Sequence, residues 1–176
     1  DVCSSVLINN GPIMGVDTYF SGTVAAAREG AINGIPGIAI SMNNWLGGGD
    51  YEAAARVALH FAEWVLRHDL PAGVFLNINV PDCSGAEMRG VEATRLGKRF
   101  YNERLDMRKS PAGQTYYWLV CGDMGFHPDP GSDLDAVASG FISVSPLGLD
   151  CLDHGTLEKF RKSWEKPGLH LPGKAV

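Results

Sequence analysis

The chain has 176 residues, a formal net charge of −5 and 45% hydrophobic residues, which suits one globular domain with a well-buried core. The charge is spread thinly and forms no basic cluster, so a nucleic acid polymer is not an expected partner. No apolar stretch reaches the about 20 residues that span a bilayer, so no membrane association is expected. The four cysteines form no Cys-x-x-Cys pair, and we expect reduced thiols in a cytoplasmic protein.

The first half of the chain alternates predicted strands and helices. An apolar run at 2–8 predicts a strand, and an alanine-rich run at 24–34, preceded by a Ser-Gly-Thr turn, predicts a helix. Apolar runs at 35–41 and 74–80 predict two further strands. Between them, the three- and four-residue spacing of apolar residues in 51–68 indicates a helix with one buried face. This alternation predicts an α/β fold with a parallel sheet and right-handed crossovers.

The second half has shorter and more polar elements. Runs at 90–94, 99–107 and 114–120 predict strands of a β-rich appendage, the last two joined by a turn. A further strand is predicted at 141–145 and a final, charged helix at 156–164. We therefore expect a core followed by a carboxyl-terminal helix and tail.

The turn Ser21-Gly22-Thr23 is the first candidate for a binding site. In an open parallel sheet, ligands bind beyond the carboxyl ends of the strands, where this turn and Asn9 are expected to lie. Gly22 would let an anion approach the backbone, both hydroxyls can donate, and the free N–H groups of the next helix carry partial positive charge. The same residues also suit a plain helix N-cap, and both interpretations stay open at this point.

Asn9 could bind a hard cation such as Mg²⁺ or Mn²⁺ through its carbonyl oxygen, although a single amide cannot hold one. The acidic residues that could assist it are interpreted as solvated loop charges: Asp17, Asp123, Asp129, Asp133 and Asp135. No histidine has a metal-ligand spacing, and the sequence contains no Gly-x-Ser-x-Gly, Walker or Gly-x-Gly-x-x-Gly motif. Serine-hydrolase, nucleoside-triphosphatase and dinucleotide-binding functions therefore lack their usual motifs.

Several ordered blocks of the sequence resemble the SurE survival-protein family of nucleotidases. The resemblance extends over nearly the whole chain to about Asp150. It rests on residues 8–12, 21–27 with 29–30, 34–41, 76–81, 116–118, 132–133 with 136–137, and 140–147.

The resemblance implies a Rossmann-like three-layer α/β core with a parallel sheet, a β-hairpin extension and a carboxyl-terminal helix. The implied domains are a core at 1–150 with an extension at about 90–120, and a helix and tail at 151–176. Members of this family remove phosphate from nucleoside 5′- and 3′-monophosphates with a divalent cation (Mg²⁺ or Mn²⁺). The family also implies a homodimer or homotetramer in which the carboxyl-terminal element takes part in subunit exchange.

The resemblance also assigns roles to individual residues. Asn9 matches the metal-binding Asn, and Ser21, Gly22 and Thr23 match the phosphate-binding turn. Of these, Ser21 and Thr23 would be catalytic by holding the charge that develops on the phosphoryl group. The nucleoside monophosphate is the implied small-molecule partner.

Three departures from the family pattern support an alternative function. The family's Asp-Asp pair and metal-binding Ser lie in a segment that the printed sequence does not contain. In addition, Val6-Leu7 replaces the usual Ser-Gly, and Ile13 replaces a second Asn near the phosphate, which removes a hydrogen-bonding group. The alternative is a non-catalytic relative that binds nucleotide or serves in oligomer assembly.

Overall fold

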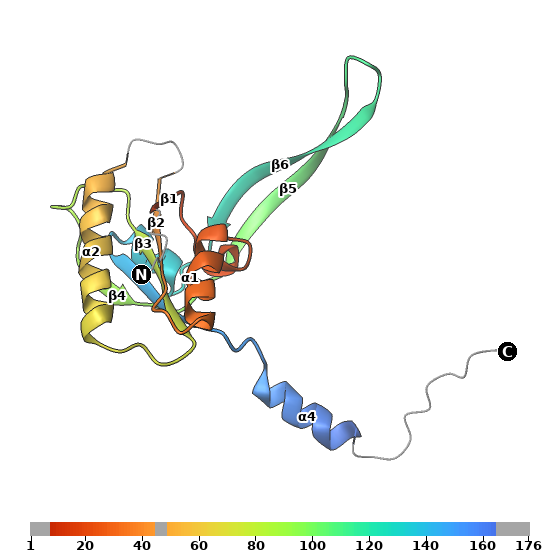
Figure 1. Cartoon of the computed structure of the whole chain (residues 1–176). Coiled ribbons are helices and arrows are strands. Elements are labelled where there is room, and N and C mark those ends of the chain that lie inside the picture. Colours follow the sequence, from red (N-terminus) through yellow and green to blue (C-terminus); the bar gives the residue numbers. More distant parts are fainter. Residues whose placement is uncertain (1–7, 45–48, 165–176) are drawn as a thin grey trace.

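The computed structural model describes residues 8–44 and 49–164 and shows helices packed on a five-stranded sheet (Figure 1). The strand order is β1-β2-β3-β7-β4. The strands are β1 (Ile8–Asn10), β2 (Ile38–Met42), β3 (Val74–Val80), β4 (Val91–Ala93) and β7 (Ile142–Gly148). The predicted α/β class is thus confirmed. The predicted strand at 2–8 lies outside the described residues except for Ile8.

The sheet is mixed, in contrast to the expected parallel sheet. Strands β1, β2 and β3 are parallel, whereas β7 is antiparallel to β3 and β4 is parallel to β7. Ten residues without a helix join β3 to β4. This is shorter than the crossover that two parallel strands need, so the chain turns back and β4 runs opposite to β3. Because β4 belongs to this sheet, the appendage begins at Arg99 and not near residue 90.

Two helices cover opposite faces of the sheet and confirm the predicted ones (Figure 1). Helix α1 (Gly22–Ile32) packs on one face, against a cluster that includes Ala39 and Phe75. Helix α2 (Tyr51–Arg67) packs on the other, against a cluster that includes Ile40 and Ile78. Side chains alternate between the two faces along each strand, so the sequence Ile38–Met42 serves both layers. The result is a three-layer core.

The α1 face of the sheet carries a row of buried polar side chains beside this apolar cluster. The strand register places them side by side on β2, β3 and β7: Ser41, Asn77, Asn79, Ser143 and Ser145. Thr94 bonds to both serines of β7, at 2.7 and 2.8 Å between oxygens. Buried polar groups are costly without partners, and the amides of β3 bond to the loop that follows β1.

That loop contains a short 3₁₀ helix, η1 (Gly15–Tyr19), which the sequence did not predict. Gly15 has a φ of +55°, and a Cβ there would lie 2.5 Å from the Gly97 carbonyl oxygen, so glycine is required by both conformation and space. The Gly15 N–H donates to a carboxylate oxygen of Asp133 at 2.7 Å. Asp133 begins a second unpredicted helix, α3 (Asp133–Ala138).

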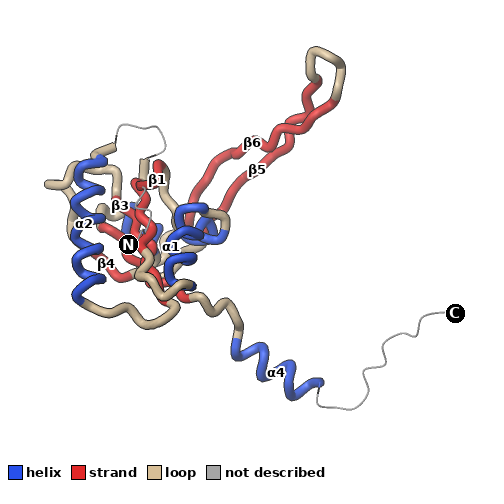
Figure 2. The backbone as a smooth tube through the Cα atoms, viewed as in Figure 1, coloured by secondary structure: helices blue, strands red, loops and turns tan. Residues whose placement is uncertain are grey.

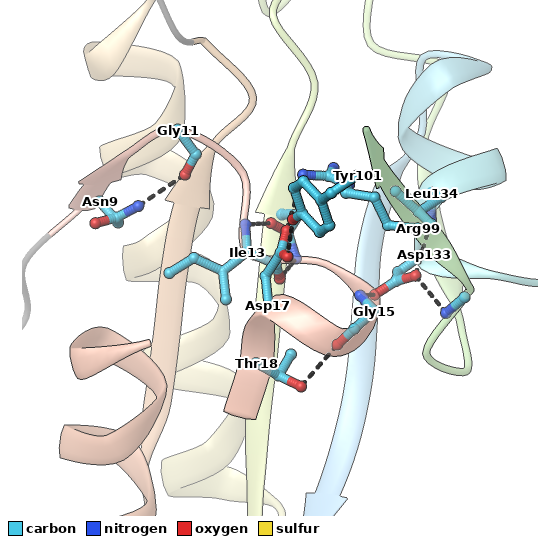
Figure 3. A network of polar contacts seen from close by, with 12 residues as sticks. Asn9, Gly11, Ile13, Gly15, Asp17, Thr18, Arg99, Tyr101, Asp133 and Leu134 are labelled. Atoms are coloured by element: carbon cyan, nitrogen blue, oxygen red, sulfur yellow. Dashed lines mark hydrogen bonds and ion pairs between the residues drawn. The ribbon is translucent and has the colours of Figure 1, made fainter. Parts of the chain in front are cut away.

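The interpretation of Asp133 as a solvated loop charge is wrong. Its carboxylate is fully buried and accepts N–H bonds from Gly15, Gly97 and Leu134, at 2.7, 2.7 and 2.9 Å. Burial raises the pKa of Asp133, while the three N–H donors act in the opposite direction. The carboxylate thereby joins η1, the segment before β5 and α3 (Figure 3).

The predicted extension is a two-stranded antiparallel hairpin of β5 (Arg99–Lys109) and β6 (Thr115–Phe126) that projects from the body (Figure 2). Its outer half exposes several large apolar side chains, among them Leu105, Met107, Tyr117 and Trp118. The final helix, α4 (His154–Trp164), buries none of its residues. No helix among residues 8–44 and 49–164 is long and apolar enough to cross a membrane.

Replacing Asp133 by Asn tests the role of its carboxylate. The amide leaves one acceptor oxygen where two now serve three N–H groups, so a buried donor loses its partner. We expect Asp133→Asn to lower the free energy of unfolding by about 1–3 kcal/mol in urea titrations. Asp135→Asn, a control at a partly exposed position of the same helix, should stay within about 0.5 kcal/mol. Equal effects of both variants would contradict this account.

Candidate active site

A cavity of about 630 Å³ lies beside the amino terminus of α1. Asn9, Ser21, Gly22 and Thr23, the four residues that the sequence suggested, all line it. They come from the carboxyl-terminal part of β1 and from the first turn of α1. The base of the β5–β6 hairpin adds Tyr101 to the wall. A cavity of this size accommodates a small organic ligand.

The side chain of Asn9 is oriented by its own amide group. Its Nδ2 donates to the carbonyl oxygen of Gly11 at 2.7 Å (Figure 3) and to that of Asn10 at 3.2 Å. This fixes Oδ1 in the opposite direction, where its one hydrogen bond within residues 8–44 and 49–164 is a long contact of 3.5 Å from the Thr23 hydroxyl. Asn9 Oδ1 is therefore a weakly engaged, hard oxygen acceptor, which suits a cation such as Mg²⁺ or Mn²⁺.

The turn at Ser21 caps helix α1. The Ser21 Oγ accepts the Val24 N–H at 3.1 Å, so the N-cap interpretation is confirmed. The cap leaves the N–H groups of Gly22 and Thr23 without a hydrogen-bond partner among the described residues. A Cβ added at Gly22 would meet nothing within 4 Å. Two unpaired N–H groups at a helix amino terminus beside an open cavity suit an anion.

Asp17 forms a polar cluster with the hairpin that sequence analysis missed. Arg99 donates to its carboxylate at 2.8 Å, and the Tyr101 hydroxyl donates to the other oxygen (Figure 3). The Arg99 side chain is only 8% exposed. The prediction of a solvated charge at Asp17 is therefore wrong. These partners lie 82 and 84 residues away along the chain, and no local pattern links them.

The remaining acidic candidates supply no metal site. Asp129 is bonded to Arg95, which lowers its pKa, and Asp135 is partly exposed, so both remain surface charges. The side chain of Asp123 lies outside the described part of the structure. Within residues 8–44 and 49–164, no group of three or more His, Cys, Asp or Glu side chains could hold a metal ion. Asn9 thus fits one position of a metal site, and the described residues do not complete it.

Ile13 occupies a core position. Its side chain is buried with Val24 and Phe75. Its N–H donates to Asn79 Oδ1 at 2.8 Å, and its carbonyl oxygen accepts from the amides of Asn77 and Asn79, both at 2.9 Å. The apolar residue at this departure from the family pattern is therefore integrated into the fold. The other departure, Leu7, lies outside the described residues.

Comparisons with known proteins agree with this geometry. The family model described as "Survival protein SurE" matches residues 3–103. The chain belongs to the SurE family. It is 42% identical over 155 residues to the 5′-nucleotidase SurE of Symbiobacterium thermophilum, covering 88% of this chain and 60% of that protein. It is 36% identical over 168 residues to the 5′-nucleotidase SurE of Syntrophomonas wolfei, covering 96% and 63%.

A solved structure shows the same SurE fold. The crystal structure of the SurE protein from Aquifex aeolicus superposes with a TM-score of 0.77 at 37% identity, covering 91% of this chain and 64% of that one. The chain thus spans about 60% of the length of the curated SurE relatives that it matches. The resemblance inferred from the ordered sequence blocks is confirmed.

The Tyr101 hydroxyl predicts a pH dependence for this SurE chain. Burial and the hydrogen bond to Asp17 raise the pKa of Tyr101 above the usual value of about 10. A group with a raised folded-state pKa contributes stability that is present below its unfolded pKa and lost as pH rises through the folded one. We therefore expect part of the free energy of unfolding to disappear above about pH 10, and Tyr101→Phe to lack this loss.

Urea titrations from pH 7 to 11 measure this effect. Tyr117→Phe, a control at an exposed tyrosine of the same hairpin, should keep the pH dependence of the unmodified chain. The account of Tyr101 fails if its Phe variant loses stability with pH as steeply as the Tyr117 control.

Proposed function

We propose that this chain forms the nucleotide-binding part of a metal-dependent phosphatase that converts nucleoside 5′- and 3′-monophosphates to nucleoside and phosphate. The observation that carries the proposal is the meeting of Asn9 with the Ser21-Gly22-Thr23 turn in one cavity of about 630 Å³. The curated relatives are named 5′-nucleotidases. Their name and this cavity support the same chemistry.

The turn supplies the phosphate-binding groups. The N–H groups of Gly22 and Thr23 are unpaired among the described residues, and the Thr23 hydroxyl points at Asn9. Ser21, although it caps α1, can still donate its hydroxyl proton toward the cavity. These donors and the helix dipole would hold the phosphate and stabilise the charge that develops as the ester bond breaks.

Asn9 would be one ligand of the divalent cation, through Oδ1. The remaining ligands, the family's Asp-Asp pair and Ser, would come from outside the described residues. When bound, Mg²⁺ or Mn²⁺ polarises a phosphoryl oxygen and lowers the pKa of a bound water. The Thr23 side chain would then lie between the cation ligand Asn9 and the phosphate, because its hydroxyl already contacts Asn9.

The protein would act as a homo-oligomer in the cytoplasm. The exposed apolar residues of the β5–β6 hairpin, together with the unburied helix α4, support a homodimer or homotetramer. Cys83 and Cys151 are free thiols, in keeping with a reducing cytoplasm. Nucleoside monophosphates would be the substrates, and no polymeric nucleic acid or membrane partner is included.

One observation favours the alternative of a non-catalytic nucleotide-binding relative. The described residues offer a cation one amide oxygen and no cluster of carboxylates. The two functions differ in their response to chelators. Nucleotide binding that persists unchanged in EDTA, without hydrolysis, supports the alternative.

Phosphate release decides between them. GMP, AMP and 3′-AMP are incubated with Mn²⁺, Mg²⁺ or EDTA, using this chain and the full-length gene product. We expect metal-dependent release that falls about 10- to 100-fold in Thr23→Val, the effect of losing a hydrogen bond worth about 1.5–3 kcal/mol to a charged group. Thr115→Val, a control on the exposed hairpin, should retain full activity. No release with any divalent metal from either protein would falsify the enzymatic function.

Gly22 tests the phosphate-binding turn independently of folding. Gly22→Ala adds a Cβ that meets no protein atom within 4 Å and should leave the helix as stable or up to about 1 kcal/mol more stable. The methyl group would narrow the approach to two N–H groups. We expect the inhibition constant of inorganic phosphate to rise about 10-fold, equivalent to about one charge-assisted hydrogen bond.

The control for this variant is Gly155→Ala, at a glycine of α4 that lines no part of the cavity. It should change neither the inhibition by phosphate nor the turnover. Unchanged phosphate inhibition in Gly22→Ala would remove the turn from the proposed site.

A further inference from the structure

Phe20 is an exposed aromatic residue at the wall of the candidate active site. Its side chain is 89% exposed, yet it lines the same cavity as Ser21, Gly22 and Thr23. Its backbone N–H donates to the Asp17 carbonyl oxygen at 3.1 Å and closes η1. The backbone that carries the ring is therefore fixed, while the ring itself has little packing. An aromatic face presented beside a phosphate turn suits a planar ligand group.

The hairpin contributes a second feature to the lining of this cavity. The pairing of β5 with β6 is irregular between Tyr101 and Glu103, and both residues line the cavity. A β-bulge in a hairpin changes the direction of the side chains beside it, and such irregularities are frequent next to active sites. The exposed Glu103 carboxylate has no ion-pair or hydrogen-bond partner among the described residues. It is available to accept hydrogen bonds from a ligand.

The cavity is larger than a phosphate group requires. Its volume of about 630 Å³ lies in the range of about 300–1,000 Å³ that is typical of sites for small organic molecules. Besides Gly22 and Thr23, its lining includes Val16, Phe20 and Glu103, whose apolar and acidic groups no phosphate would select. These groups suit the uncharged, planar and N–H-bearing part of a nucleotide.

We propose that this part of the cavity is a nucleobase subsite, in which the Phe20 ring stacks on the base and the Glu103 carboxylate accepts its N–H groups. The inference rests on the proposed nucleotidase function. Guanine presents a ring N–H and an adjacent amino group to one carboxylate, whereas adenine presents an amino group next to a ring acceptor. The subsite therefore favours guanine over adenine nucleotides.

The kinetics of three substrates test the stacking role. The full-length gene product is assayed with GMP, AMP and ribose 5-phosphate, which has no base. Phe20→Ala should raise KM about 10-fold or more for both nucleotides, since base stacking on aromatic side chains is sequence-tolerant. It should leave KM for ribose 5-phosphate within about twofold, and Phe20→Tyr should restore the nucleotide KM. Tyr19→Ala, a control at the adjacent exposed aromatic residue, should change none of the three.

The role of Glu103 is measured as a ratio. In the unmodified protein kcat/KM for GMP should exceed that for AMP, and Glu103→Gln should bring the ratio close to one because its amide replaces an acceptor by a donor. A GMP/AMP ratio that Glu103→Gln leaves unchanged contradicts this part of the proposal. An equal rise of KM for ribose 5-phosphate in Phe20→Ala contradicts the stacking role.

Guanosine binding separates this proposal from the enzymatic one. Saturation-transfer NMR measures guanosine binding to the unmodified chain and to Phe20→Ala without any phosphate chemistry. Binding that Phe20→Ala abolishes supports the subsite even if no phosphate is released from any nucleotide, in which case only the phosphatase function fails. If guanosine does not bind, or binds Phe20→Ala equally well, the subsite is refuted while hydrolysis stands on its own assay.

Discussion

The candidate site depends on a set of buried polar side chains that hold the loop between β1 and α1 on the sheet. The amides of Asn77 and Asn79 bond both main-chain groups of Ile13, and the Asp133 carboxylate accepts the N–H of Gly15. A buried amide or carboxylate is costly unless it is paired, so these side chains stabilise the fold only when the loop is in place. The same bonds determine the position of Ser21 at the end of the loop, and hence the position at which the first turn of α1 contacts Asn9.

The hairpin is joined to the same loop. Asp133 also accepts the Gly97 N–H, two residues before β5, and Arg99 and Tyr101 of β5 bond to Asp17 of η1. The base of the hairpin is thus fixed to the wall of the cavity by two carboxylates that lie more than 100 residues apart in sequence. The base of the hairpin is thus bonded directly to η1, which ends at Tyr19, two residues before Ser21.

How well the sequence predicted each helix and strand depends on the length of its apolar pattern. The predicted strand at 74–80 and helix at 51–68 match β3 and α2 almost residue for residue, because each has a long apolar pattern. The five- and six-residue helices η1 and α3 have too few turns for periodicity to show. The direction of β7 was not predicted either, since an apolar run carries no information about the neighbouring strand.

The prediction of site residues divides in the same way. Asn9 and the Ser21 turn could be found because helix caps and strand ends have local sequence signals. Asp133 and Asp17 could not be distinguished from ordinary loop acids, since their partners Gly15, Gly97 and Arg99 are distant in sequence. A buried carboxylate is recognised by its tertiary donors, and no property of its immediate neighbours reveals them.

The distribution of charge in the cavity explains why an anion could bind beside two acidic residues. Asp17 lies four residues before Ser21 and would repel a phosphate if it were unpaired. Arg99 is held against it with only 8% of its side chain exposed, so the pair is close to neutral where it faces the cavity. Glu103, the cavity carboxylate without a cation among the described residues, lies on the hairpin and not on the turn at Ser21. A ligand that carries an anion at one end and hydrogen-bond donors at the other would suit both the N–H groups of Gly22 and Thr23 and the Glu103 carboxylate, which line the same cavity.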